Sequence, residues 1–286
     1  MSAATAAALV RPMVEHDIHQ VATVTAEAFG TDIGEAWARR VWEQRLRHSL
    51  INDPDGSFVS ARDGLVTGAA QAVIRDRVWI LSLMAVSPTL GAGGEGRALM
   101  DSALDYGRDC DGGLIIASND PRALRLYASS GFALQAAFKA NGTVDPSVLP
   151  DPDPAITPVA PADLGSLEQI SRAARGAVHT PDLEVALFRG SSVSRLEDRG
   201  FVVSMPGRGV WALAARDEQA ATALLWHALA ELLHEPRIEI GWVTGHQQWA
   251  IDVLLAARLS LSAYGAIATR GDVGPMHPYI PSPPFA

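Results

Sequence analysis

The chain has 286 residues, which is enough for one large domain or for two domains of ordinary size. Hydrophobic residues make up 48% of it, so it can build a folded core, and no stretch approaches the roughly 20 uninterrupted apolar residues that span a membrane. The net charge of -9 argues against nucleic acid or an anionic membrane as the main partner, because both bind basic surfaces, and it is compatible with a cationic substrate.

The N-terminal segment and the cysteine content predict a cytoplasmic protein, and the histidines predict that it holds no metal. The first residues, MSAATAAALVRP, have no basic residue before their alanines and therefore do not resemble a secretory signal peptide. Cys110 is the single cysteine, so no disulfide can form within the chain, as is usual in a reducing compartment. The spacing of the histidines does not suggest a metal site.

Two segments far apart in the chain follow the same plan. Residues 9–30 and residues 156–176 each contain an apolar pair, a proline, a short polar turn, an aspartate and then a helical pattern. Asp17 and Asp163 stand at matching places and are predicted helix N-caps. In the first copy, Gln20 follows three residues after the aspartate, as in a capping box.

The match between the two halves resumes further along the chain. Residues 77–79 (RVW) parallel residues 209–211 (GVW), and residues 119–132 parallel residues 246–259 in the same order. Between the copies lies VDPSVLPDPDPAITP, which is dense in proline and aspartate and has the composition of a linker. We therefore expect a first domain over residues 1–143, a linker over 144–155 and a second domain over 156–286.

The middle of the first half predicts a buried strand, a glycine loop and a helix. Residues 78–86 (VWILSLMAV) suit a strand buried on both faces, and LGAGGEG at 90–96 leads into a helical pattern over 97–109. Glycines let a backbone approach a ligand closely, and the first N–H groups of the helix attract a phosphate. The loop lacks the Gly-Lys-Ser/Thr ending of a P-loop, and it comes too late in the domain for a dinucleotide fold.

A second pattern follows about twenty residues later. The apolar strand GGLIIAS at 112–118 precedes NDPRALRLYASSGF, in which Pro121 suits the first turn of a helix and Gly131 suits its end. Phe132 then begins the next predicted strand.

These two patterns resemble motifs A and B of the GNAT acetyltransferases, and the resemblance covers most of residues 8–140. It implies an α/β fold class with tandem GNAT folds, each a mixed, mostly antiparallel central sheet flanked by helices. It also implies acetyl-CoA as co-substrate, with Asn119 near the pantetheine arm and the backbone of the strand at residues 85 and 86 paired with that arm. The acetyl-CoA contacts that it implies are Ala85, Val86, Gly91, Gly93, Gly94, Gly96, Arg97, Ala98, Asn119 and Arg122.

The glycine loop departs from the family motif at two positions. Gly91 stands where the family usually has glutamine or arginine, and Glu95 places an anion close to where a pyrophosphate would lie. Both departures predict weaker or differently arranged phosphate contacts, which Arg97 would offset from the helix start.

The family resemblance places Tyr127 at the sulfur end of CoA. A phenol with a pKa near 10 can protonate the thiolate that leaves when an amine attacks a thioester. Tyr127 is therefore the expected general acid. The base is left open among carboxylates and one hydroxyl: Glu27, Asp32, Glu35, Asp76 and Ser82.

The second half lacks the residues of this chemistry. Its glycine loop is gone, Asp217 and Glu218 stand where a pyrophosphate would need donors, and Leu254 stands opposite Tyr127. We expect this half to be a degenerate GNAT-like domain that forms one wall of the acceptor pocket.

The expected function is N-acetylation of a primary amine on a small molecule, with an aminoglycoside-like antibiotic among the acceptors considered. Acetylation of a peptide or protein is one alternative, and acyl-CoA binding without catalysis is another. We expect a monomer or a homodimer.

Overall fold

The computed structural model describes residues 9–89 and 94–281. Its contacts divide the chain into two compact units, each made of two segments. Unit 1 contains Met1–Ile74 and Trp79–Cys110, and unit 2 contains Arg75–Val78 and Asp111–Ala286. The described part contains no helix long and apolar enough to cross a membrane.

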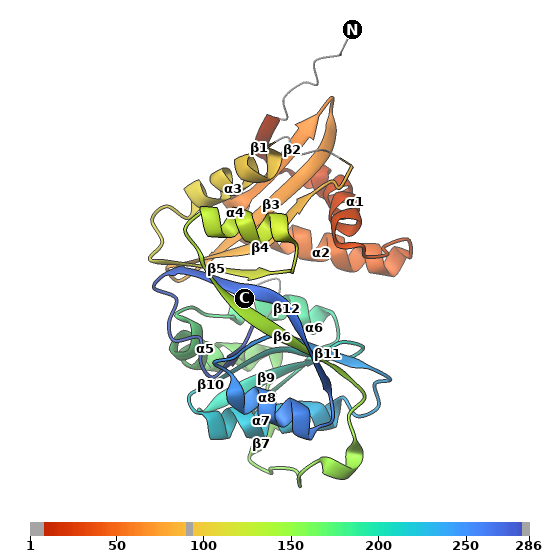
Figure 1. The fold of residues 1–286 in the computed structure, drawn as a ribbon, viewed down its shortest axis with the longest axis vertical. Coiled ribbons are helices and arrows are strands. Elements are labelled where there is room, and N and C mark those ends of the chain that lie inside the picture. The colour runs from red at the N-terminus through yellow and green to blue at the C-terminus, as the bar shows by residue number, and fades with distance from the viewer. Residues whose placement is uncertain (1–8, 90–93, 282–286) are drawn as a thin grey trace. The chain divides into compact units, whose positions relative to one another are not determined.

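Unit 1 is a sheet with the strand order β1-β2-β3-β4, covered by helices (Figure 1). Strands β1 and β2, and strands β2 and β3, pair antiparallel. The turn between β2 and β3 is Asp63-Gly64, and both residues have positive φ, as a tight hairpin turn requires. The elements are β1 (Leu9–Pro12), a 3-10 turn (Glu15–Asp17), α1 (Ile18–Phe29), α2 (Ala36–Asn52), a second 3-10 turn (Pro54–Gly56), β2 (Ser57–Arg62), β3 (Leu65–Arg75), β4 (Val78–Val86) and α3 (Glu95–Tyr106).

Helices cover both faces of the unit 1 sheet. Val59 of β2 packs in an apolar cluster with buried residues of α1 and with Leu46 of α2. The next residue, Ser60, points to the other face, where its hydroxyl donates to Glu95 of α3 at 3.2 Å. Helices α1 and α2 therefore lie on one face of the sheet, and α3 lies on the opposite face.

Unit 2 contains two sheets and the remaining helices (Figure 1). Its first sheet contains strands in the order β5-β12-β6-β11, and its second sheet has the order β13-β10-β9-β8-β7. The elements are β5 (Gly112–Ala117), α4 (Pro121–Ser129), β6 (Ala133–Gly142), a 3-10 turn (Pro146–Val148), β7 (Ile156–Pro158), a 3-10 helix (Pro161–Leu167), α5 (Glu168–Arg175), α6 (Thr180–Phe188), β8 (Ser192–Leu196), β9 (Gly200–Met205), β10 (Gly209–Ala215), α7 (Glu218–Glu231), β11 (Ile238–Thr244), α8 (Gln248–Ala256), β12 (Ser260–Gly271) and β13 (Tyr279–Ile280).

Strand β12, from the end of the chain, lies between β5 and β6. It pairs antiparallel with β5 from Ala266↔Ala117 to Gly271↔Gly112. It also pairs antiparallel with β6 along most of its length, and the other neighbour of β6 is β11. Both partners of β6 therefore come from the C-terminal half of the sequence.

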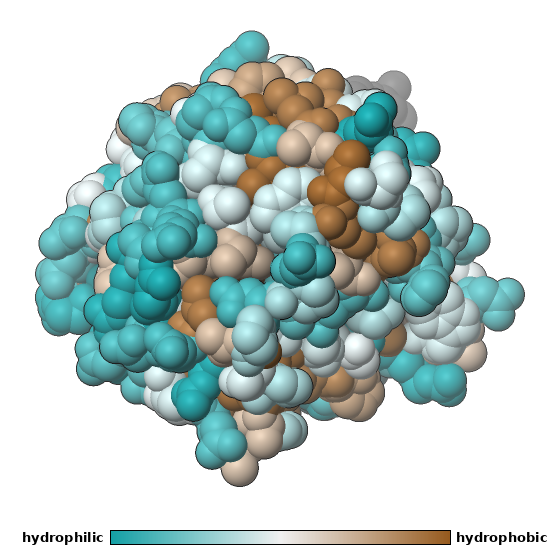
Figure 2. All heavy atoms as spheres, turned by 90° about the horizontal axis from the view of Figure 1, so that it is seen from below, coloured by the Kyte–Doolittle hydropathy of each residue, from teal (hydrophilic) through white to brown (hydrophobic). Residues whose placement is uncertain are grey.

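Apolar residues of α7 and α8 pack with buried residues of β10 and β11 to form the larger core of unit 2. A second core lies among α5, α6, β9 and β10. Figure 2 shows one face of the molecule, on which hydrophilic side chains predominate and hydrophobic residues gather toward one edge of the view.

The predicted fold class is confirmed, since mostly antiparallel sheets are flanked by helices. The predicted strand at 78–86 is present, Pro121 is the first residue of α4, and Gly131 has the left-handed φ of +86 after that helix. The predicted capping box at Asp17 and Gln20 is wrong.

The carboxylate of Asp17 accepts from Val14 N and from Arg11, while Gln20 Oε1 accepts from Val66 N at 3.0 Å. Arg11 also holds the pKa of Asp17 below its usual range. Asp17 does stand at the predicted N-cap position, directly before α1, but its side chain makes no cap hydrogen bond there. Asp163 is not an α-helix N-cap, because it lies inside a 3-10 helix and α5 begins at Glu168.

Candidate active site

Strand β4 changes the face of its side chains part of the way along. The indole of Trp79 donates to the carbonyl of Ala103 in α3 at 2.7 Å, whereas Leu83 and Ala85 pack in the cluster with α1 and α2. Residues separated by an even number of positions share a face in a regular strand. The alternation is therefore shifted by one residue between Trp79 and Leu83, which indicates a β-bulge in this strand.

Ser82 lies in the stretch where the alternation shifts. Its carbonyl accepts a hydrogen bond from the guanidinium of Arg45 in α2, and that guanidinium lies over the ring of Trp42, 5.1 Å from the ring centroid. The Ser82 side chain is buried, and its hydroxyl has no hydrogen-bond partner among the described residues. A buried hydroxyl of this kind can hold a water or a polar group of a ligand.

The helix α3 begins at the end of the glycine loop. Gly94 is its N-cap and has a φ of +80, and no atom of the described residues lies within 4 Å of the place where a Cβ would stand. Those residues therefore leave the backbone at the helix start open to a ligand, and the first N–H groups of a helix lack partners inside it. Gly91 and Gly93 lie outside the described residues.

The other predicted contacts in unit 1 lie on the first turn of α3 and at the end of β4. Gly96 is half-buried, and Arg97 and Ala98 are exposed, with Arg97 3.9 Å from the carboxylate of Asp101 one turn later. Ala85 is buried and Val86 is half-buried. The helix dipole makes the N-terminal end of α3 positive, and Arg97 lies on its first turn.

Glu95 turns away from the open end of α3. Its carboxylate is 2.7 Å from the guanidinium of Arg62, accepts from Ser60 at 3.2 Å, and is 4% exposed. The expectation that Glu95 presents its charge to a phosphate is therefore wrong, because the charge is neutralised inside unit 1. Arg62 and Ser60 were not anticipated from the sequence, since neither lies near the glycine loop in the chain.

The predicted contacts in unit 2 surround the start of α4. The N-cap of this helix is Asp120, whose carboxylate accepts from Arg122 N at 2.8 Å. The same carboxylate pairs with the Arg122 side chain at 2.8 Å and raises the pKa of that guanidinium. Asn119 comes just before the cap and is exposed. Asn119 and the backbone around it can therefore contact a ligand, while Arg122 is already held by Asp120.

Tyr127 lies in the last turn of α4 and is 5% exposed. Burial raises the pKa of its phenol well above the ordinary value, and the negative charge of Asp120 raises it further. No described residue forms a hydrogen bond with this hydroxyl. The phenol therefore stays protonated at neutral pH and has a proton to donate.

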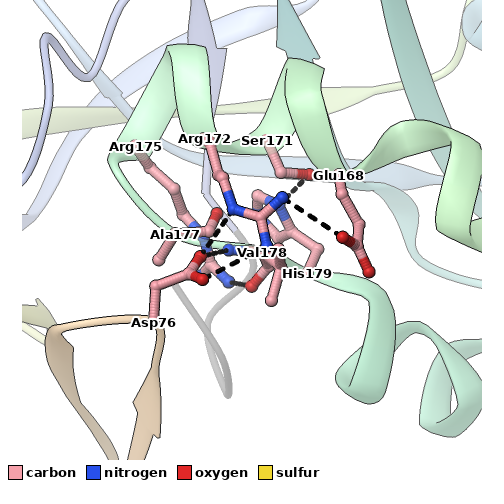
Figure 3. Close-up of polar contacts among 8 residues, drawn as sticks. All are labelled: Asp76, Glu168, Ser171, Arg172, Arg175, Ala177, Val178 and His179. Atoms are coloured by element: carbon pink, nitrogen blue, oxygen red, sulfur yellow. Dashed lines mark hydrogen bonds and ion pairs between the residues drawn. The ribbon is translucent and has the colours of Figure 1, made fainter.

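The candidate bases are not equally available. Glu27, Asp32 and Glu35 are exposed, and Asp32 accepts from Gly34 N at 2.8 Å. Asp76 is held by Arg172, with Oδ2 3.1 Å from Nε, and by Val178 N at 3.1 Å (Figure 3). The carboxylate of Asp76 is thus already engaged by partners within unit 2.

The start of α7, in the second half of the sequence, is capped by a carboxylate. Asp217 is the N-cap of α7, accepts from Ala220 N at 2.9 Å and pairs with Arg199 at 2.7 Å. The N–H groups there are thus partly satisfied by the chain itself. Among the described residues, no group of three His, Cys, Asp or Glu side chains could hold a metal ion.

The sequence matches the family described as "Acetyltransferase (GNAT) family" over residues 18–132. No curated protein matches it in sequence. Among solved structures, a putative acetyltransferase from Pyrococcus horikoshii is similar, with a TM-score of 0.78 and 16% identity over 96% of this chain and 94% of that one.

A tandem GNAT protein from the clavulanic acid biosynthesis pathway has a TM-score of 0.58 and 15% identity, covering 92% of this chain and 98% of its own. A GCN5-related N-acetyltransferase from Sphaerobacter thermophilus has a TM-score of 0.58 and 16% identity, covering 92% and 95%. At these identities the structures support the fold, and the family match supports the activity. The chain therefore contains a domain of the GNAT acetyltransferase family over residues 18–132.

Proposed function

We propose that the protein transfers the acetyl group of acetyl-CoA to a primary amine of a small molecule. The observation that carries the proposal is the position of Tyr127: a buried phenol in the last turn of α4, with no hydrogen-bond partner among the described residues. Such a group can give its proton to a thiolate as the thiolate leaves. A protein that only binds acyl-CoA has no use for this proton donor.

The proposed acetyl-CoA contacts in unit 1 are Ala85, Val86, Gly91, Gly93, Gly94, Gly96, Arg97 and Ala98. The open start of α3 supports this assignment, because its N–H groups and positive end suit a pyrophosphate. Because Glu95 turns inward and pairs with Arg62, its negative charge does not face an anion at this end of the helix. In unit 2 the proposed contacts are Asn119 and Arg122, and Tyr127 is the proposed acid.

The second half, from residue 156 onward, is proposed as a degenerate GNAT-like domain that borders the acceptor site. The carboxylate at the start of α7 supports this, because it occupies the position that a phosphate would need. A linker over 144–155 and a first domain over 1–143 remain the proposed division of the sequence. The net charge of -9 supports amino sugars, including aminoglycosides, as the first acceptors to test.

Two glycine variants test the cofactor site. Position 94 has a left-handed backbone that asparagine and aspartate tolerate better than other residues, so Gly94→Asn and Gly94→Asp carry a similar strain. They differ in charge alone. Calorimetric titration with acetyl-CoA should give at least about tenfold weaker binding for the aspartate variant than for the asparagine variant. Equal affinities, or no binding to the unaltered protein, would reject this site.

A tyrosine variant tests the chemistry. Tyr127→Phe should lower the acetylation rate of amino sugars by about 10²- to 10⁴-fold, while the acetyl-CoA affinity stays within twofold. Tyr279→Phe is the matched control, because Tyr279 is also buried in unit 2 but its hydroxyl is 2.8 Å from His179 Nε2. An unchanged rate in Tyr127→Phe would refute the acid assignment, and faster transfer to peptides than to amino sugars would refute the acceptor class.

A further inference from the structure

The carbonyl of Ala117, the last residue of β5, is bound by a side chain from a distant part of the chain. The indole Nε1 of Trp242 in β11 donates to it at 2.8 Å. Residues 118–120 then lead directly into α4. The strand end that precedes the proposed acetyl-CoA contact Asn119 is thus held by the second half of the sequence.

Trp242 makes this contact from a strained conformation. Its φ is 55°, a region in which a bulky side chain is a rare exception. The register between β11 and β6 shifts between Ile240 and Val243, so Trp242 lies in a β-bulge. Strained residues and bulges are found preferentially at functional sites, where a bulge redirects a side chain.

Strand β12 approaches the same carbonyl. Gly265 has a φ of +63, and a Cβ at this position would lie 2.1 Å from the oxygen of Ala117. The register between β12 and β6 shifts between Ala263 and Ala266, so Gly265 also lies in a bulge. Two bulges in two different strands therefore adjust the surroundings of one carbonyl group.

Further side chains fix the orientation of the indole. The ring of Tyr264 meets Trp242 edge to face, with the centroids 5.1 Å apart. The ammonium of Lys139 lies 4.3 Å from the centroid of the Tyr264 ring and pairs with Glu239 at 2.9 Å. The indole of Trp242 is thus held in place by Tyr264, which is held in turn by Lys139 and its partner Glu239.

We propose that Trp242 is a positioning residue for the acetyl-CoA contacts at the start of α4, and this rests on the proposed function. The indole fixes the end of β5, and because only residues 118–120 separate that end from α4, it also fixes Asn119 and the helix that carries Tyr127. The second half of the sequence thereby contributes to cofactor binding without touching the cofactor.

Trp242→Phe removes the indole N–H and keeps an aromatic ring beside Tyr264. Trp249→Phe is the matched control, because Trp249 is a buried tryptophan of the same unit whose indole donates to Gln247 Oε1 at 2.9 Å. Amide hydrogen exchange of residues 118–125 is measured on both variants without ligand. We expect exchange there to accelerate at least about fivefold in Trp242→Phe and to be unchanged in Trp249→Phe, since one hydrogen bond at that carbonyl is lost.

The same proteins are titrated with acetyl-CoA, and we expect about 3- to 10-fold weaker binding for Trp242→Phe alone. Equal exchange and affinity in the two variants, or a change of thermal stability without either effect, would overturn the positioning role. If the unaltered protein binds no acetyl-CoA, the proposed function fails on its own, and the exchange comparison still decides whether Trp242 orders residues 118–125. If Trp242→Phe does not fold, Tyr264→Leu, which retains the indole but removes its edge partner, is tested for the same two changes.

Discussion

Replacing Glu95 by glutamine tests which way the first residue of α3 faces. In the structure its carboxylate is 2.7 Å from Arg62, and the side chains of Glu95 and Arg62 are 4% and 18% exposed. Glutamine keeps the shape but leaves a mostly buried guanidinium without its counter-charge. Breaking a fully buried pair costs about 3–5 kcal/mol, and a hydrogen bond to a charged group contributes about 1.5–3 kcal/mol. Because Arg62 retains some contact with water, we expect the free energy of unfolding to fall by about 2–3 kcal/mol.

Urea denaturation followed by circular dichroism measures this change through the midpoint at a constant slope. Asp101→Asn is the control, because Asp101 lies on the same helix in an exposed pair with Arg97, 3.9 Å away. Exposed pairs of this kind contribute little, so we expect a change of about 0.5 kcal/mol or less. A loss in Glu95→Gln that is no larger than the loss in this control would show that Glu95 is not buried against Arg62.

The affinity of Glu95→Gln for acetyl-CoA distinguishes two orientations of Glu95: toward the pyrophosphate, as the sequence suggests, or toward Arg62, as in the structure. If the Glu95 carboxylate faced the pyrophosphate, its removal would relieve a repulsion and tighten binding. In the structure the charge is already neutralised on the opposite side, so glutamine should leave the affinity unchanged or slightly weaker. Binding that becomes severalfold tighter would refute the orientation of Glu95 described above.

Two further predictions concern unit 2 and the buried tyrosines. Asp182→Asn should lower the free energy of unfolding, measured by urea denaturation, by about 3–5 kcal/mol. The reason is that Asp182 and Arg75 form a bidentate pair at 2.5 and 2.8 Å, in which their side chains are 1% and 6% exposed. Asp111→Asn is the control and should have little effect, because its pair with Arg77 is exposed. Burial raises the pKa of Tyr127 and Tyr279 in the folded protein. Their contribution to stability is therefore complete below the ordinary tyrosine pKa of about 10 and is lost as the pH rises above it. Between pH 8 and 11, the urea midpoint should fall less steeply in Tyr127→Phe than in the unaltered protein.

Local sequence patterns predicted those parts of the fold that depend on neighbouring residues. The apolar run of β4, the proline at the start of α4 and the glycine after it each act within one element, so their effect can be deduced from the order of residues. The orientation of Glu95 depends on Arg62, which lies 33 positions earlier and carries no local signal. The same is true of Trp242, whose partner Ala117 is 125 residues away.

The helix caps show a different limit of the sequence. Asp17 stands directly before α1 but makes no side-chain cap hydrogen bond there, and at Asp163 a 3-10 helix displaces the start of α5 to Glu168. In the first copy Arg11 also takes up the carboxylate. Several hydrogen-bond donors of similar energy compete for one carboxylate, and a helix-capping propensity does not tell which of them it accepts from.

Cutting the chain after residue 143 tests how far the sequence repeat corresponds to folding units. The fragment would keep β5 and β6 but lose β11 and β12, which are the strands that pair with β6, and β12 also covers one edge of β5. Unpaired backbone groups on a buried strand are unfavourable, and an exposed apolar edge promotes aggregation. We therefore expect residues 1–143 alone to aggregate or to bind no acetyl-CoA, and co-expression with residues 144–286 to restore a soluble complex that binds it.

Analytical ultracentrifugation and titration with acetyl-CoA would measure both outcomes of this cut. A monomeric fragment that binds acetyl-CoA as tightly as the whole chain would show that β5 does not need β12. That result would also remove the basis for a role of Trp242, since Trp242 lies in the part removed. Restoration by the second fragment would instead mean that the second half completes the sheet on which α4, the helix of the proposed acid Tyr127, packs, even though its own helix start is capped by Asp217.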